Sequence, residues 1–156
     1  MAERTALVAG NGKMHGSRAM GAELVNAIAA DRPSGIDIAV FPPNPYLAEL
    51  ASSCGKADIA LGAQDVSGHT DEGAYTGEVS AAMLVDVGCS MVLVGHSERR
   101  QYHGESDELL AEKFAAARQA GLVPVLCLGE SLEQREAGAT EEVVSRQLAA
   151  VLDHVG

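Results

Sequence analysis

A glycine-rich turn near the N-terminus holds the first side chains that could do chemistry. Residues 10–17 read Gly-Asn-Gly-Lys-Met-His-Gly-Ser and follow a short apolar run. The spacing fits neither the phosphate-binding loop, which closes on Gly-Lys-Ser/Thr, nor the dinucleotide pattern G-x-G-x-x-G. A lysine at the mouth of a sheet would still supply a fixed positive charge for an oxyanion or a phosphate. Lys13 is therefore a candidate anion ligand, and the alternative is a solvated loop lysine.

A second candidate is His96, which follows the apolar run Ser90 to Val94 and precedes the polar stretch Ser97 to Arg100. If a short helix begins at Ser97, the positive end of its dipole lies beside the imidazole and disfavours the imidazolium. A neutral histidine can donate a hydrogen bond and polarise a carbonyl group. The alternative is a structural histidine that caps the strand end.

A long connection, residues 64–78, contains three glycines and an exposed aromatic residue, Tyr75. Connections of this length are usually functional or interaction elements. The small residues around Tyr75 favour a protrusion that docks into a partner, with a lid as the alternative. His69 and His103 are better explained as solvated side chains than as ligands.

Short apolar runs alternate with stretches of helical spacing, which predicts repeated βα units. Several runs are apolar at successive residues, as expected of parallel strands buried on both faces. The predicted strands are Thr5 to Ala9, Ile36 to Phe41, Asp58 to Ala63, Ser90 to Val94 and Leu122 to Leu128. The predicted helices run from about Ser17 to Ala30, from Asn44-Pro45 to Gly55, from about Val79 to Val87, from Ser106 to Gly121 and from Thr140 onward, the last with Val143, Val144, Leu148, Val151 and Leu152 along one face.

About five βα units are compatible with a small doubly wound sheet or with part of a (β/α)8 barrel. A complete barrel typically needs about 250 residues, so the length of 156 residues favours the doubly wound sheet. Both architectures place functional groups at the C-terminal ends of the strands. Lys13 and His96 occupy such positions.

Composition predicts one globular domain over residues 1–156, with 47% hydrophobic and 21% charged residues. The formal charge of −11 disfavours nucleic acid and anionic membranes as partners. The sequence has no transmembrane or signal-peptide pattern, and we expect a cytoplasmic protein. Cys54, Cys89 and Cys127 lack metal-binding spacing and are expected to be free buried thiols, with no metal site.

Three motifs together resemble triosephosphate isomerase, in order and at the right separations: GNGKMHG, GAYTGEVSAAML and VLVGHSERR. The third is highly specific to that family. The resemblance runs from the first strand to the last residue, including Cys127-Leu128-Gly129-Glu130 and the QLAAVL helix. It implies a (β/α)8 barrel of the TIM type, here incomplete with about five parallel βα units, and so overrides the argument from length.

The resemblance implies a glycolytic isomerase that interconverts dihydroxyacetone phosphate and glyceraldehyde 3-phosphate through an enediolate, without metal or cofactor. By motif, Asn11 and Lys13 line the site of this small phosphorylated substrate, and Lys13 counters the phosphate and the enediolate oxygen. His96 matches the neutral electrophile; triosephosphate isomerase, with its helix-lowered histidine, is the established example of this arrangement. Supporting residues are Ser97, Glu98, and the salt-bridged pair Arg99 and Glu105. Tyr75, Thr76, Gly77 and Glu78 match the tip of a loop that inserts into the neighbouring subunit, which implies a homodimer.

The chain departs from the family pattern at three places. Gly12 replaces the usual tryptophan, which would leave a hole beside Lys13, and His15 replaces the usual asparagine where the partner's loop would pack. The family's general base, a glutamate after a sixth strand, has no counterpart among the 156 residues. We therefore expect the N-terminal part of a longer isomerase. The alternatives are an inactive fragment that self-associates or needs a complementary C-terminal half, and a small flavodoxin-like binding domain.

Overall fold

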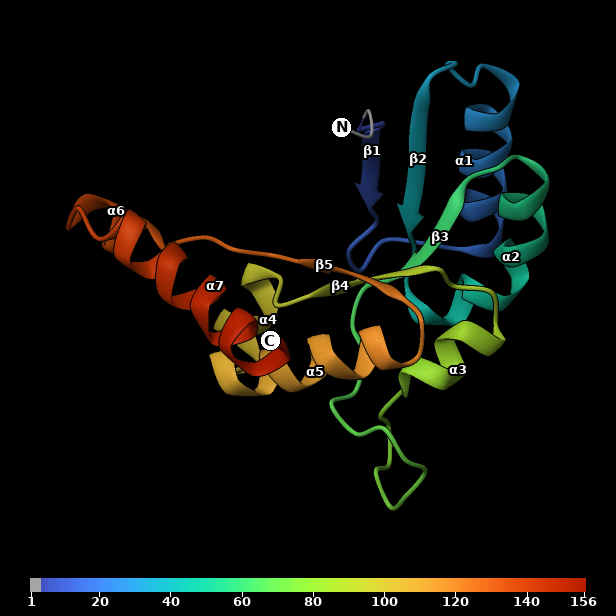
Figure 1. The fold of residues 1–156 in the computed structure, drawn as a ribbon. Helices are drawn as coiled ribbons and strands as arrows, with labels where there is room; N and C mark the ends of the chain where they lie inside the picture. The colour runs from blue at the N-terminus through green and yellow to red at the C-terminus, as the bar shows by residue number, and fades with distance from the viewer. Residues whose placement is uncertain (1–3) are drawn as a thin grey trace.

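Five parallel strands form one sheet in a computed structural model that describes residues 4–156 (Figure 1). The strands pair in chain order, β1-β2-β3-β4-β5, and the sheet curls into an incomplete barrel. Their bounds are β1 Ala6–Asn11, β2 Ile36–Phe41, β3 Ala60–Ala63, β4 Met91–Val94 and β5 Val123–Leu126. The helices are α1 Arg18–Ala30, the 3-10 turn η1 Asn44–Tyr46, α2 Leu47–Lys56, α3 Ala81–Asp86, α4 Ser97–Tyr102, α5 Asp107–Gln119, α6 Leu132–Glu136 and α7 Thr140–Val155.

The strand order decides between the two architectures that the periodicity allows. In a doubly wound sheet the order reverses at a switch point, whereas a barrel adds each new strand on the same side of the previous one. The observed sequential order is that of a barrel, so the expectation from chain length was wrong and the expectation from the motifs is confirmed.

The two faces of the sheet bury different residues, because successive side chains of a strand point to opposite sides. On the side of the helices, Val40 and Val92 belong to the main core. On the concave side, Phe41 and Leu93 belong to a smaller cluster. Gly62 makes room for the fully buried Phe41 ring, since a Cβ at Gly62 would overlap the ring carbons.

Serine caps explain several helix starts. The hydroxyl groups of Ser17 and Ser106 accept hydrogen bonds from the backbone N–H groups of Met20 and Leu109, at helix starts that the sequence predicts. Ser131 forms a capping box with Gln134 at the start of α6, a helix that was not predicted from the sequence. Asn44 does not cap a helix; it begins the turn η1. Gly55 lies inside α2 rather than at its end.

Two further expectations need correction. The third strand begins at Ala60, because Asp58 has a φ of +54° and its carboxylate pairs with Arg32 at 3.2 Å. In α7, Val143 and Val151 are buried as predicted, together with Gln147, whereas Leu148 and Leu152 are exposed. The buried face of α7 therefore includes fewer residues than the apolar pattern of its sequence predicts, because the helix packs mainly on α5.

Two of the three cysteines are buried thiols, as predicted, and Cys127 is half-buried. Burial raises the pKa of all three, that of Cys89 to about 11 with a further contribution from Cys54. These thiols are therefore protonated near neutral pH.

No helix within residues 4–156 is long and apolar enough to cross a membrane.

Candidate active site

The C-terminal ends of β1, β3 and β4 open into a hollow of about 350 Å³. Its polar lining residues are Asn11, Lys13, Gln64, His96, Glu98, Arg99, Tyr102 and His103. The structure thus brings together residues from two motifs that are more than eighty positions apart. Five of them, Asn11, Lys13, His96, Glu98 and Arg99, are residues that the sequence predicts for the site.

The backbone of Lys13 is held in an unusual conformation. Its φ is +50°, a region that non-glycine residues rarely adopt. The Oδ1 atom of Asn11 accepts a hydrogen bond from the Lys13 N–H at 2.9 Å. The Nε2 atom of Gln64 donates to the carbonyl oxygens of Lys13 and Phe41, both at 2.8 Å. Side chains from two strand ends therefore fix the turn that carries Lys13.

Gln64 is a site residue that the sequence analysis missed. Its position was the available signal, since it is the first polar residue after the apolar run that ends at Ala63. At that position of a parallel sheet a polar side chain reaches the functional edge. The structure gives it a positioning role, because it contacts the backbone of Lys13 rather than the Lys13 ammonium group.

The ammonium group of Lys13 pairs with the carboxylate of Glu98, with Nζ and Oε1 separated by 2.7 Å. Both side chains are about half exposed, at 51% and 43%. The hydrogen bond from Lys13 lowers the pKa of Glu98. The ion pair with Glu98 therefore holds the Lys13 ammonium group at the hollow. An anion that enters the hollow could replace Glu98 as the partner of Lys13.

His96 is the N-cap of α4, which confirms the predicted helix start at Ser97. Its Nδ1 atom accepts a hydrogen bond from the N–H of Glu98 at 3.2 Å. An Nδ1 atom that accepts a hydrogen bond carries no proton, so the ring proton sits on Nε2. Nε2 is therefore the ring nitrogen that is free to donate a hydrogen bond to a substrate oxygen.

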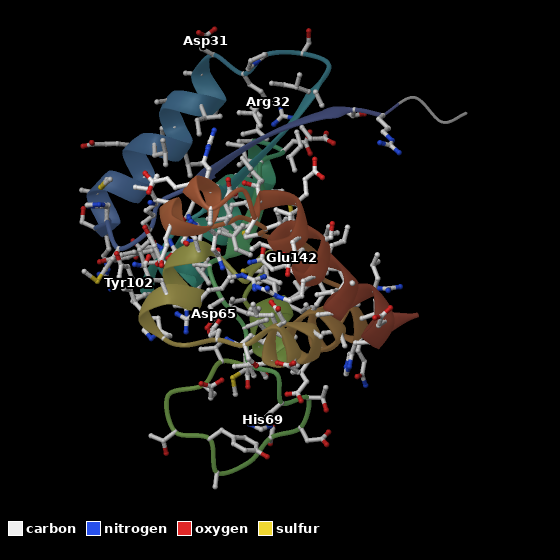
Figure 2. All side chains as sticks on the ribbon, turned by 90° about the vertical axis from the view of Figure 1, so that its left-hand side faces the viewer. Asp31, Arg32, Asp65, His69, Tyr102 and Glu142 are labelled. Carbon is white, nitrogen blue, oxygen red and sulfur yellow. The ribbon has the colours of Figure 1, made fainter. Side chains whose placement is uncertain are left out.

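Arg99 and Glu105 form the predicted salt bridge, with Nε and Oε1 2.7 Å apart. This salt bridge is part of a network of four charged side chains, in which Lys113 Nζ contacts Glu105 at 2.6 Å and Asp65 at 2.8 Å (Asp65 is labelled in Figure 2). Arg99 closes the ring by pairing with Asp65 at 3.1 Å. Among the described residues, the Oε2 atom of Glu105 is buried without a hydrogen-bond partner.

Lys113 and Asp65 were missed by the sequence analysis. Lys113 sits on the apolar face of α5, between the buried Leu110 and Ala117, and its side chain is only 6% exposed. A lysine on a buried helix face is the available signal, because a buried ammonium group must be paired. The network ties α4 to α5 and to the residue that follows Gln64.

The network makes a pH prediction through Glu105. Burial alone would raise the pKa of this carboxyl, but hydrogen bonds from Lys113 and Arg99 outweigh burial and lower it. Because the pKa of Glu105 is lower in the folded state than the unfolded value of 4.5, its ionisation stabilises the folded protein, and this contribution is complete above pH 4.5. This contribution is lost as the pH falls through the folded pKa.

We therefore expect urea unfolding at several pH values to show a loss of stability below about pH 4.5 that is shallower in Glu105→Gln. The matched control is Glu142→Gln, an exposed carboxylate on α7 (Figure 2). It should keep the wild-type pH dependence. Equal slopes in all three proteins would contradict the assignment to Glu105.

Ser97 and the loop residues Tyr75 to Glu78 do not line the hollow. Ser97 is exposed on α4 and borders a different hollow with Arg100. Arg100 fastens α4 by donating to the carbonyl oxygens of Gly95 and Cys127. The loop of Tyr75 projects from the body of the molecule, where the rings of Tyr75 and His69 stack 3.7 Å apart (Figures 1 and 2).

No cluster of metal-ligating side chains occurs within residues 4–156. The hollow instead presents two cations, two imidazoles, two amides and one carboxylate: Lys13 and Arg99, His96 and His103, Asn11 and Gln64, and Glu98. That set can bind an anion and polarise a carbonyl oxygen next to it.

The sequence profile of triosephosphate isomerase matches residues 6–156, which is nearly the whole chain. The chain belongs to the triosephosphate isomerase family. It is 61% identical over 154 residues to the triosephosphate isomerase of Stenotrophomonas maltophilia strain K279a and 60% identical to that of Xanthomonas campestris strain 8004. Each alignment covers 98% of this chain and 61% of the relative, so the chain spans about three fifths of the length of these isomerases.

The fold agrees with this assignment. The crystal structure of triosephosphate isomerase from Bartonella henselae superposes with a TM-score of 0.89 at 38% identity. The superposition covers 95% of this chain and 62% of the Bartonella chain. The five strands therefore correspond to a large part of a triosephosphate isomerase barrel.

Proposed function

We propose that the hollow is the electrophilic part of a triosephosphate isomerase active site, for the interconversion of dihydroxyacetone phosphate and D-glyceraldehyde 3-phosphate. The observation that carries the proposal is that Lys13 and His96, from two distant motifs, face one hollow of about 350 Å³. Membership of the family and the orientation of both side chains support it.

The proposed chemistry follows from the charges in the hollow. Removal of a proton from the carbon next to the carbonyl group places negative charge on the carbonyl oxygen, giving an enediolate. The Nε2–H of His96 would donate to that oxygen, and the ammonium group of Lys13 would stabilise the enediolate and the substrate phosphate. Preorganised donors of this kind stabilise a developing oxyanion without reorganisation at the moment of reaction. Asn11 would contribute by holding the Lys13 turn, since its Oδ1 already accepts the Lys13 N–H.

The proton-abstracting base is proposed to come from polypeptide outside the 156 residues. Among the described residues, Glu98 is the only carboxylate that lines the hollow, and it is paired with Lys13. A carboxylate held by an ammonium group is a weaker base than a free one. In this proposal the chain, residues 1–156, is the N-terminal portion of the isomerase and works in the cytoplasm without metal or cofactor.

A homodimer is part of the same proposal. The projecting loop of Tyr75, Thr76, Gly77 and Glu78 is suited to docking because it stands away from the body of the molecule (Figure 1). The stack of Tyr75 on His69 stiffens its tip. Arg99, which lines the hollow, and Glu105 would support the active site through the ion-pair network.

A second candidate, a catalytically inactive fragment that self-associates, is favoured by one observation. All six residues of the edge strand β1 are exposed, including Leu7 at 45% and Val8 at 57%. Exposed apolar edge strands pair with other chains.

Complementation tests the proposal. The chain is mixed with a polypeptide that comprises the part of the Stenotrophomonas maltophilia isomerase outside the matched region, and isomerisation is followed by a coupled dehydrogenase assay. We expect the mixture to exceed the chain alone by on the order of 10²-fold or more, because a positioned base contributes that much. Light scattering on the same samples reports assembly. Assembly without activity would contradict the isomerase proposal, and aggregation of the chain alone with no gain on mixing would favour the fragment.

A further inference from the structure

The backbone that leads into His96 leaves the sheet one residue before the histidine. β4 ends at Val94, whose carbonyl oxygen accepts a hydrogen bond from the N–H of Cys127 at 2.8 Å. Gly95 follows with a φ of +77°, so the chain turns out of the strand conformation before it reaches His96. The carbonyl oxygens of Gly95 and Cys127 therefore lie beyond the last register pair of β4 and β5.

The guanidinium group of Arg100 joins these two carbonyl oxygens. Its Nε donates to Gly95 O at 2.8 Å, and its Nη2 donates to Cys127 O at 3.2 Å. Its Nη1 pairs with Oδ1 of Asp107 at 2.6 Å. The side chains of Arg100 and Asp107 are 15% and 19% exposed, so water competes little for these bonds. A planar guanidinium group presents its donors in a rigid fork, whereas the ammonium group of a lysine is a point charge on a flexible stem.

Gly95 allows the guanidinium group to lie this close to the backbone. A Cβ at position 95 would lie 3.0 Å from Nη2 of Arg100 and 2.9 Å from a methyl carbon of Leu110. The positive φ would strain any other residue at this position as well. Arg100 is therefore packed against the turn that precedes His96.

We propose that Arg100 is a positioning residue that orients His96 through the peptide group between Gly95 and His96, an inference that rests on the proposed function of His96. The hydrogen bond at Gly95 O fixes the plane of this peptide group, and with it the direction in which the His96 side chain leaves the backbone. At the other end, the N–H of Glu98 donates to Nδ1 of the ring at 3.2 Å. The imidazole is thus restrained both at its backbone and at its ring, which keeps Nε2–H in one direction at the hollow.

Nitrogen NMR of the His96 ring in the full chain, at alkaline pH, tests the orientation without any catalysis. In the wild type we expect one ring form, with the proton on Nε2. Arg100→Met should give averaged ring signals from both tautomers. Hydrogen exchange of the Glu98 amide should become roughly two- to tenfold faster, as expected when about one hydrogen bond is lost. The ring signals come from folded molecules, so a purely structural role of Arg100 would leave them unchanged.

Two further variants keep this test decisive. Arg100→Lys retains a positive charge beside Asp107 but not the fork, so we expect a folded protein with averaged ring signals. Arg146→Met is the matched control, because Arg146 also pairs with Asp107, at 3.3 Å, and among the described residues donates to neither carbonyl oxygen. It should give wild-type ring signals. Wild-type signals in Arg100→Met, or in Arg100→Lys if the methionine variant does not fold, would overturn the proposal. Averaged signals in Arg146→Met would overturn it as well, because they would assign the effect to Asp107.

The complemented enzyme adds a kinetic readout. Arg100→Lys should lower kcat by about 10- to 100-fold with little change in KM, since a displacement of a reacting group by about 1 Å has an effect of this size. An unchanged kcat beside averaged ring signals would overturn the catalytic part of the proposal. If the wild-type mixture is inactive, the proposed function fails, and the ring signals still decide whether Arg100 orients His96.

Discussion

Replacing Lys113 by methionine is expected to lower the free energy of unfolding by about 3–5 kcal/mol. The Lys113 ammonium group contacts Glu105 at 2.6 Å and Asp65 at 2.8 Å, and the side chains of Lys113 and Glu105 are almost fully buried. Methionine keeps most of the side-chain volume but leaves a buried carboxylate with only Arg99 as its cationic partner. Removing one member of a buried ion network is costly because the remaining carboxylates have lost their hydration and are then only partly compensated by Arg99.

Urea unfolding of the variant measures this effect, with Lys56→Met as the matched control. Lys56 is an exposed lysine in the last turn of α2, so its replacement should cost less than about 1 kcal/mol. The double variant Lys113→Met, Glu105→Leu should recover part of the loss, because an apolar pair needs no hydration. A loss below about 1 kcal/mol for Lys113→Met alone would show that Arg99 suffices to hold Glu105.

The second large effect is expected on turnover, and it rests on the proposed function. In the complemented enzyme, His96→Gln should reduce kcat by about 10²- to 10³-fold, because one oriented donor to the developing oxyanion is lost or misaligned. KM should change less, since this interaction is strongest in the transition state. Glutamine can still accept the Glu98 N–H that caps α4, so we expect stability close to that of the wild type.

The coupled assay and urea unfolding are both needed for this variant. His154→Gln, in the exposed last turn of α7, is the control and should leave kcat unchanged. Unaltered kcat in His96→Gln would remove His96 from the chemistry. A large loss of stability together with lost activity would assign it a structural role at the start of α4.

Much of the candidate site could be predicted from the sequence because its residues lie directly after apolar strands. Lys13 and His96 were found in this way, and the motif that contains His96 also gave the helix start at Ser97. Gln64 also lies directly after an apolar strand. A glutamine in the sequence does not show whether its amide group binds the backbone or is solvated. Its function depends on two carbonyl oxygens, those of Lys13 and Phe41, which come close only in the folded chain.

The sequence alone determined the five strands and most helix starts, because apolar periodicity and serine caps act over a few neighbouring residues. It also determined the family, through motifs whose order and spacing are specific. The strand order and the ring of Asp65, Arg99, Glu105 and Lys113 became known only from the folded chain. Both depend on long-range contacts. Local propensity sets the shape of each element, whereas the pairing of strand edges, buried charges and facing surfaces is settled by contacts between residues far apart in the chain.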